Sequence, residues 1–400
     1  MSKRPNGDGG TAPMTRPYQI TLFAASSETG RLCAHYLAAA WRRDTFTWAI
    51  AGSNLKQLSL LRRALKAEYG QDCSPGVLKV KPEQQQSLDA MAAQTRVLLN
   101  ASSAPAQHGE PVVRACVHAA CDYVDASNDS AFIDFVQRKF HAAAERQQIK
   151  LINGCELEGL GSDMAALFAV QTLAAKVDAR NPQQALAAEA VTLHSYSPAR
   201  PDSAAEIWQT LNKQRLRCVQ RRWNSAVAGS CGQRHVQALP GALHWQAALS
   251  AWGVSSATCG LPLVLRSACA SGNYGERFEY GQYTVFQDLP QAALNLLQAG
   301  RARVLRKLRR AQPSPAAPAE TAPRQWSVLA ESSQERVQVS VQAAADDSSE
   351  SAKILAEAAL HLALQANVPA AFGALTPVQG LGSGFIPRLQ RAGMQFVGEP

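Results

Sequence analysis

The sequence contains no run of the roughly 20 apolar residues that a membrane-spanning helix requires. Its most apolar stretch, residues 245–270, is interrupted by glycines, a proline and an arginine. The first 17 residues lack the apolar core of a signal peptide and are rich in glycine, proline, lysine and arginine. We therefore expect a disordered tail at 1–17 and an intracellular protein that is not secreted, being cytoplasmic or at most peripheral on a membrane.

Metal-binding patterns are also absent. The cysteines are scattered without a CxxC pair or the Cys/His spacing that zinc needs, and the eight histidines form no HxxxH pattern. We expect no metal site, and we expect the cysteines to be buried free thiols in a reducing compartment. The nine cysteines are Cys33, Cys73, Cys116, Cys121, Cys155, Cys218, Cys231, Cys259 and Cys269.

Aromatic residues make up only 6% of the chain, although its formal net charge is +9. A basic balance can indicate a nucleic acid, an anionic cofactor or a membrane surface as partner. Because aromatic residues are few and the arginine clusters are local, we expect no nucleic-acid partner. The charge alone does not distinguish an anionic cofactor from a membrane surface as the partner.

What the sequence does contain is a regular alternation of short β-branched runs and longer amphipathic runs between Tyr18 and Asn153. This alternation is typical of βαβ units, and continuous apolar runs such as 48–50 suit parallel strands covered on both faces. We predict an α/β fold with a Rossmann-like doubly wound parallel sheet over 18–183 and a second, α+β domain over 184–400. The predicted strands are Ile20–Phe23, Phe46–Ala51, Val77–Val80, Arg96–Asn100, Tyr123–Asp125 and Ile149–Asn153, with Ala190–Tyr196 and Phe278–Phe286 in the second domain.

The stretch 19–30 reads QITLFAASSETG, a strand-like run followed by small residues and the start of a helix predicted over Gly30–Trp41. A dinucleotide-binding unit begins in this way, with three glycines. The first allows a tight turn, the second lets the backbone approach the pyrophosphate, and the third lets the helix pack on the strand. The corresponding positions here are Ala24, Ser27 and Gly30, so only the third glycine is kept.

Several stretches together resemble one protein family. Residues 24–32 (AASSETGRL) stand where the family has GATGFTGRL, and residues 51–58 (AGSNLKQL) stand where it has AGRNxxKL. The chain resembles the saccharopine dehydrogenase-like oxidoreductases, which include the trans-acting enoyl reductases of lipid synthesis. Other similar segments are LN at 99–100, GEPVVRAC at 109–116, DYVD at 122–125, GCELEGLGSDMAA at 154–166, LPLVLRS at 261–267, FEYGQY at 278–283, SAKILAEAAL at 351–360 and GALTP at 373–377.

The resemblance implies NADP or NAD as cofactor and a hydride transfer involving a lipid-like or other unsaturated substrate. It implies an active site between the two domains and, from the family's association with lipid droplets and membranes, a peripheral place on a lipid droplet, mitochondrion or other membrane. The positions that it implies for cofactor binding are Ser26, Ser27, Thr29, Gly30, Ser53, Asn54 and Asn100.

This chain departs from the family pattern where the family binds its cofactor. Ala24 and Ser27 replace glycines, and Glu28 places a carboxylate near the position of the pyrophosphate. Ser53 replaces an arginine that would pair with a 2′-phosphate, and no acid nearby replaces it to bind the ribose of NAD. We predict weakened cofactor binding, with no readable choice between NAD and NADP.

Two interpretations of residues 26–30 stay open: a retained nucleotide site whose hydroxyl groups bind phosphate, or a plain strand-to-helix turn capped by hydroxyl groups. No acid, base or nucleophile can be assigned a catalytic role from its spacing. We interpret Ser162 and Asp163 as the N-cap of a helix that runs through Val177 rather than as a catalytic pair. Asp122 and Asp125 could be paired carboxylates, but a solvated strand end is the preferred interpretation.

Two stretches of the second domain differ from the rest. Residues 289–310 combine leucines with six lysines and arginines, which suits either a basic amphipathic helix on an anionic lipid surface or a surface helix docked by its leucines. Residues 312–324 carry four prolines and little to bury, so we predict a disordered insertion. The predicted function is a saccharopine dehydrogenase-like NAD(P)-dependent oxidoreductase of lipid or glycolipid metabolism. The alternative is a catalytically degenerate relative that serves as a lipid-surface or protein-binding scaffold.

Overall fold

The computed structural model describes residues 16–102, 105–180, 186, 189–198, 231–232, 234–239, 243–256, 258–287, 323–344 and 348–398. The predicted tail up to residue 15, the predicted basic helix at 289–310 and residues 312–322 of the predicted insertion lie outside these residues.

The first sheet is parallel and doubly wound, as predicted. Its seven strands lie in the order β14-β6-β5-β4-β1-β2-β3. They are β1 (Tyr18–Phe23), β2 (Trp48–Gly52), β3 (Gly76–Lys79), β4 (Thr95–Asn100), β5 (Asp122–Asp125), β6 (Lys150–Ile152) and β14 (Gly373–Leu375). The first six are the six strands predicted from the alternation, with ends shifted by at most two residues.

Helices cover both faces of this sheet, and the strand sequences show why. Successive side chains of a strand point to opposite faces. In β4, Val97 and Leu99 join one hydrophobic cluster while Leu98 joins the other. The first cluster includes residues of α1 (Glu28–Ala40) and α2 (Leu55–Tyr69), and the second includes residues of α3 (Gln85–Ala93), α4 (Pro105–His118) and α5 (Ser130–Arg146).

The second domain is built on an eight-stranded mixed sheet, which confirms the predicted α+β class. Its strands are β7 (Ala190–Pro198), β8 (His235–Ala238), β9 (His244–Gln246), β10 (Ala251–Ser255), β11 (Arg277–Phe286), β12 (Gln325–Glu331), β13 (Arg336–Gln342) and β15 (Gln395–Gly398). The long helix α6 (Leu157–Arg180) and the shorter α9 (Gly260–Ala270) pack on it. The helix α6 approaches β12 so closely that a Cβ at Gly161 would lie 2.4 Å from the Trp326 ring.

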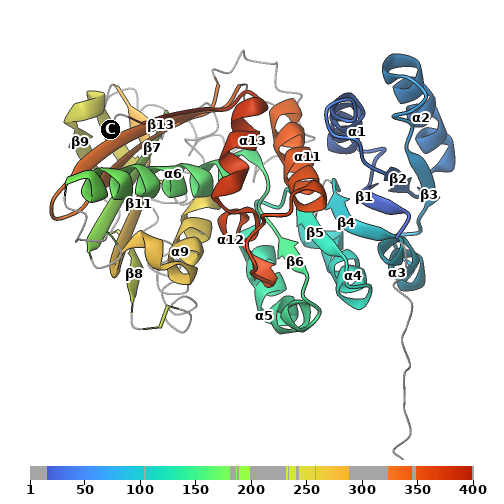
Figure 1. The fold of residues 1–400 in the computed structure, drawn as a ribbon, viewed down its shortest axis with the longest axis horizontal. Coiled ribbons are helices and arrows are strands. Elements are labelled where there is room, and N and C mark those ends of the chain that lie inside the picture. The colour runs from blue at the N-terminus through green and yellow to red at the C-terminus, as the bar shows by residue number, and fades with distance from the viewer. Residues whose placement is uncertain are drawn as a thin grey trace, which may run out of the picture.

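The C-terminal part of the chain returns to the first sheet. Figure 1 shows α11 (Ser348–Leu364), α12 (Pro377–Leu381) and α13 (Ile386–Arg391), in orange and red, between the two sheets. The helix α11 packs on α1, and β14 extends the first sheet beyond β6. A buried ion pair joins α13 to α11. Arg388 of α13 and Glu357 of α11 are 2% and 0% exposed and are hydrogen-bonded to each other.

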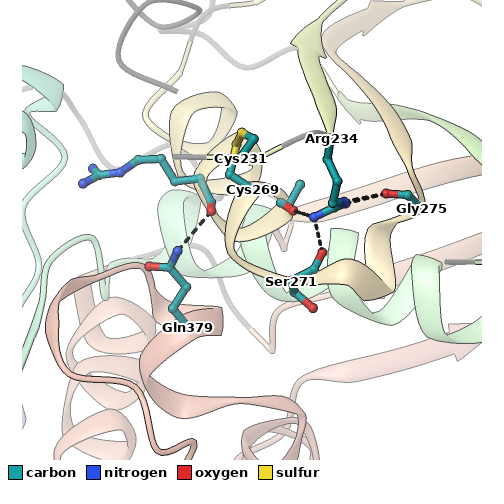
Figure 2. The surroundings of a disulfide bond; sticks show 8 residues. Cys231, Arg234, Cys269, Ser271, Gly275 and Gln379 are labelled. Carbon is teal, nitrogen blue, oxygen red and sulfur yellow. Dashed lines mark hydrogen bonds between the residues drawn. A yellow bond between two sulfur atoms is a disulfide. The ribbon is translucent and has the colours of Figure 1, made fainter. Parts of the chain in front are cut away.

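The cysteine prediction was wrong at one pair. Cys231 and Cys269 form a disulfide, shown in Figure 2 at the end of α9. The pairing brings together residues 38 positions apart, and spacing alone cannot reveal such a long-range contact. The other cysteines of the described ranges are free and buried, as predicted: Cys33, Cys73, Cys116, Cys121, Cys155 and Cys259. Among the helices that the structure describes, none is long and apolar enough to cross a membrane.

Candidate functional site

The strand order of the first sheet changes direction between β1 and β4. β1 pairs with β2 on one side and with β4 on the other, so the chain winds outward in both directions from this point. In open parallel sheets, ligands bind outside the carboxyl ends of the strands at such a switch point. The two ends are Phe23 and Asn100, which are register partners. The segments after them therefore form the candidate cofactor site.

The turn after β1 has the backbone of a glycine-containing turn without its first glycine. Ala24 has a φ of 58°, in the left-handed region that glycine adopts without strain. The kept glycine has the packing role expected of the third one. A Cβ at Gly30 would lie 2.3 Å from the main-chain oxygen of Ala24, so a larger residue there would push α1 away from the turn.

Ser27 is the N-cap of α1 and joins the two sides of the switch point. Its Oγ accepts a hydrogen bond from the main-chain N–H of Gly30, 2.9 Å away, and donates one to the main-chain oxygen of Ala101, 2.8 Å away. Ala101 directly follows β4. The hydroxyl therefore uses both an N–H of the helix terminus and the space between the strand ends, which are the two features that would receive a pyrophosphate.

The neighbours of Ser27 are partly or fully accessible. Ser26 and Thr29 are half-buried, and Glu28 is exposed in the first turn of α1. The Ser26 hydroxyl faces the end of β2, since a Cβ at Gly52 would lie 3.9 Å from its Oγ. These residues bring two hydroxyl groups and one carboxylate to the segment that follows β1 at the switch point.

At the end of β2, Ser53 and Asn54 are both exposed. Asn54 caps α2, because its Oδ1 accepts a hydrogen bond from the N–H of Gln57 at 3.2 Å. Ser53 has the open surroundings that an arginine side chain would need to reach a 2′-phosphate. The Ser53 side chain itself is too short for that role.

Asn100, the last predicted site residue, is buried in a hydrogen-bond chain. Its Nδ2 donates to the Tyr123 hydroxyl at 2.9 Å, and that hydroxyl donates to Oδ2 of Asp125 at 2.8 Å. Asn153, after β6, donates to the same oxygen at 2.8 Å. These hydrogen bonds connect the ends of β4, β5 and β6. Asn100 therefore has a structural role beneath the surface of the candidate site.

The interpretation of Asp122 and Asp125 as a solvated strand end was wrong. Asp125 is 0% exposed, and Asp122 is half-buried with its Oδ1 accepting from the N–H of Lys150 at 2.8 Å. Burial raises the pKa of Asp125 to about 6, although hydrogen bonds from Ser127, Tyr123 and Asn153 oppose the increase. A carboxylate at the end of a central strand is exposed only if the following segments leave it uncovered. The sequence alone did not show that these two carboxylates would be covered.

The N-cap interpretation of Ser162 and Asp163 was also wrong, because α6 begins at Leu157 and both residues lie inside it, fully buried. Oδ2 of Asp163 accepts from the N–H of Val378, 2.9 Å away, so this carboxylate ties α6 to the start of α12. Burial raises the pKa of Asp163 to about 6.

Sequence reasoning missed Glu156, which precedes α6. Its Oε2 accepts from the N–H of Glu158 at 2.6 Å and its Oε1 accepts from the N–H of Gly159, so Glu156 caps the helix. The thiol of Cys259 donates to the same Oε1 at 3.1 Å. Burial, followed by the charge of Glu158, raises the pKa of Glu156 to about 7, so this carboxyl group can hold or release a proton near neutral pH.

Glu158 connects the end of β6 to the second domain. Its Oε1 accepts from the Thr258 hydroxyl and from the Gln282 amide, each at 2.9 Å, and its Oε2 pairs with Arg324. Arg324 is the last residue of the stretch predicted to be a disordered insertion, so that prediction was wrong at this residue. The sequence points to this junction only through the two glutamates that follow β6. The partners of Glu158 in the second domain lie 100 or more positions away in the chain, so no local pattern reveals them.

Comparisons with known proteins agree with this geometry. Residues 28–152, from the start of α1 to the end of β6, match the model of the saccharopine dehydrogenase NADP binding domain. This part of the chain is therefore similar to the cofactor-binding domain of the saccharopine dehydrogenase-like oxidoreductases. The fold of the chain is also similar to that of apo saccharopine dehydrogenase (L-Glu forming) from Saccharomyces cerevisiae, with a TM-score of 0.52 at 11% identity over 96% of this chain and 100% of that one.

Curated relatives match little more than a third of the chain. A lipid droplet localized protein of Caenorhabditis elegans is 28% identical over 38% of this chain and 36% of its own length. A human saccharopine dehydrogenase-like oxidoreductase is 25% identical over 38% and 37%. A putative trans-acting enoyl reductase of Mycobacterium tuberculosis is 27% identical over 38% and 35%. These matches span little more than a third of each relative.

No cluster of three or more His, Cys, Asp or Glu side chains that could hold a metal ion occurs in the part of the chain that the structure describes. Two carboxyl groups with raised pKa values lie at or after the carboxyl ends of β5 and β6: Asp125, which is fully buried, and Glu156, which is half-buried. Glu156 is therefore the more accessible of the two carboxyl groups.

Proposed function

We propose that this protein is an NAD(P)-dependent oxidoreductase of lipid or glycolipid metabolism in which cofactor binding is weakened. The observation that carries the proposal is the position of the Ser27 hydroxyl at the switch point, bonded to both Gly30 and Ala101. The sheet around it is that of an NADP-binding domain, while the turn itself does not fit a pyrophosphate as a glycine-rich turn does. A bound nucleotide must displace these two hydrogen bonds or sit farther from the helix.

The chemistry that such a cofactor supplies when bound is hydride transfer. Among this chain's own residues, the hydroxyl groups of Ser26 and Thr29 are free to donate to phosphate oxygens, and Ser53 and Asn54 lie at the ribose end of the crevice. Glu28 opposes binding, because its carboxylate shares the first turn of α1 with the phosphate position. The net result is a site with few favourable contacts and one unfavourable charge.

The lipid part of the proposal is supported by the named relatives, one of which is localized to lipid droplets and another of which is a putative enoyl reductase. Glu156 is the group that we assign to proton transfer, since it combines partial exposure with a pKa near neutrality at the junction of the domains. The substrate would lie between the end of β6 and the second sheet.

Titration calorimetry with NADPH and NADH tests the cofactor site. We expect the unchanged protein to bind both more weakly than about 100 µM, which corresponds to a binding free energy of less than about 5.5 kcal/mol. A variant that combines Ala24→Gly, Ser27→Gly, Glu28→Phe and Ser53→Arg should bind NADPH at least about tenfold more tightly, because one charge-assisted hydrogen bond contributes about 1.5–3 kcal/mol.

Ser59 supplies the matched control, because it is exposed on the same helix, α2, that Ser53 precedes. Ser59→Arg adds the same charge as Ser53→Arg outside the crevice and should leave affinity unchanged. Micromolar binding by the unchanged protein that the four substitutions do not alter would show that the cofactor site lies on other residues.

A second candidate function is a binding scaffold on a lipid surface that has lost the cofactor altogether. The bridging Ser27 favours it, because its two hydrogen bonds stabilise the closed turn without any ligand. Calorimetry separates the two proposals: an improved variant that binds NADPH supports the weakened enzyme, and a variant that still does not bind supports the scaffold.

A further inference from the structure

We propose that Cys231 and Cys269 form a thiol–disulfide exchange site that fastens β8 to the end of α9 and opens when a dithiol reductant acts on it. The pair joins two different elements. Cys231 lies four residues before β8, and Cys269 is in the last turn of α9, with their Cα atoms 4.5 Å apart. This separation lies in the range that disulfides span without movement of the backbone.

The pair differs from the other cysteines in its bonding state. Six other cysteines of the described ranges remain unpaired. Burial raises the pKa values of Cys33, Cys116, Cys155 and Cys259 well above those of exposed thiols, which leaves them protonated and inert. A single disulfide among many reduced thiols is typical of reversible redox chemistry, whereas small secreted domains use disulfides as their framework.

The pair is also close to the surface. Cys231 and Cys269 are 7% and 8% exposed, whereas Cys33, Cys116, Cys121 and Cys155 are 0% exposed. A thiolate must approach a disulfide sulfur directly to exchange with it. A reductant can therefore reach the sulfur atoms of the pair, whereas it cannot reach these four thiols.

A second fastening keeps β8 in place when the disulfide opens. Arg234 lies between Cys231 and β8, and Figure 2 shows its guanidinium group directed at the chain that leaves α9. It donates to the main-chain oxygens of Ala268 and Ser271, both at 2.6 Å, and to that of Gly275 at 2.8 Å and 2.5 Å. Reduction thus loosens the attachment of β8 without releasing the strand.

The helix that carries Cys269 reaches the junction between the domains. Leu263 of α9 lies against Gly154, where an added Cβ would be 2.8 Å from its Cδ1. Farther along, Gln379 of α12 donates to the main-chain oxygen of Arg266 at 3.0 Å, the other contact drawn in Figure 2. The redox state of the pair therefore changes how firmly one end of α9 is held while its other contacts stay in place.

The exchange takes place in two steps. A thiolate of the dithiol attacks one sulfur of the pair, the Cys231–Cys269 bond breaks, and a mixed disulfide forms. The second thiolate of the reductant then attacks that mixed disulfide. The products are two cysteine thiols, which take up two protons, and the oxidised reductant with its own disulfide; the two electrons come from the dithiol.

Peptide mass spectrometry after alkylation of the native protein tests the proposal, with dithiothreitol as the reductant. Before reduction, iodoacetamide should label neither Cys231 nor Cys269. After reduction, it should label both, while Cys33, Cys116, Cys121 and Cys155, which are 0% exposed, stay unlabelled until the protein is denatured. Reduction should also lower the melting temperature by about 5 °C, because it removes a cross-link that closes a loop of 38 residues.

Variants separate this site from general effects of reductant. In Cys231→Ser and in Cys269→Ser, the reductant should no longer shift the melting temperature, whereas Cys259→Ser, at the other end of α9, should keep the full shift. Arg234→Ala should make the reduced protein lose amide protection in β8, and Arg277→Ala, on the exposed surface of β11, should not. Native protein in which both thiols react before reduction, or in which dithiothreitol never opens the pair, would overturn the proposal.

Discussion

The hydroxyl oxygen of Ser27 lies 2.8 Å from the main-chain oxygen of Ala101, 74 positions later in the chain. The contact joins the turn after β1 to the loop after β4, the two segments that a dinucleotide would separate. A glycine at position 27 could not make it. The serine at this position therefore supplies a hydrogen bond between the two segments that the glycine of the family pattern could not supply.

Ala24→Gly should stabilise the protein, because the native φ of 58° is strained for alanine and free for glycine. The left-handed region costs alanine about 1–2 kcal/mol, and the extra entropy of glycine in the unfolded chain offsets about half of that. We expect a gain of about 0.5–1 kcal/mol in urea unfolding. Ala90→Gly, exposed in the middle of α3, is the control and should lose about 1 kcal/mol. Equal losses in both variants would contradict the prediction.

The buried Asp125 should make stability fall as the pH rises from about 4 to about 6. Its pKa of about 6 in the folded protein exceeds its usual value of 3.8, so in this window the folded state holds a proton that the unfolded chain has lost. The loss amounts to about 1–3 kcal/mol.

Chemical unfolding of the unchanged protein and of Asp125→Asn at several pH values measures this effect. The difference in unfolding free energy between the two should decrease across the window. Tyr123→Phe keeps the carboxyl group but removes a hydrogen bond that lowers its pKa, so it should extend the decrease to higher pH. A difference that does not change with pH would show that Asp125 is not a buried titrating group.

Arg388→Met should destabilise the protein by about 3–5 kcal/mol, because it leaves the buried carboxylate of Glu357 without its closest cation. Arg43 and the Tyr36 hydroxyl still bond to Glu357, so the lower end of this range is expected. The double variant Arg388→Met with Glu357→Leu should recover more than half of the loss, since no buried charge then remains. Additive losses in the two single variants would rule out a coupled pair.

The basic stretch 289–310 should bind anionic vesicles at low salt. Its arginines and lysine attract acidic headgroups, and its leucines can enter the interface. Flotation with vesicles containing phosphatidylserine should recover the unchanged protein but not a variant with Arg306, Lys307 and Arg309 changed to Glu. Lys56→Glu with Arg63→Glu, on the exposed face of α2, is the control and should still float. Recovery of all three proteins alike would leave 289–310 without a lipid-binding role.

The fold of the first domain was predictable because its signals are local. β2 is buried at all five positions, and its apolar run marks it as a central strand. Gly30 could likewise be assigned its packing role from the motif alone. The start of α6 was not predictable in the same way, because its cap is Glu156, a residue type less common at N-caps than the Ser162–Asp163 pair that follows.

The candidate site was predictable only along the first strands. Ser27 was named from its position, but its partner Ala101 belongs to another strand, and no local pattern announces that hydrogen bond. The same holds for Glu158 and Arg324, which are 166 positions apart. Residues whose role depends on a distant partner need the folded structure, whereas residues whose role depends on backbone shape can be found in the sequence.

The last strand of the first sheet also sets the order in which the protein can be completed during synthesis. β14 pairs with β6 through residues 373–375, and α11 covers β1 and β4. Until the ribosome has made these late segments, the nascent N-terminal domain has an open edge at β6 and an uncovered apolar face. Such an edge is a template for pairing with another chain. Both the edge and the face are therefore covered only after residues 348–375 have been synthesised.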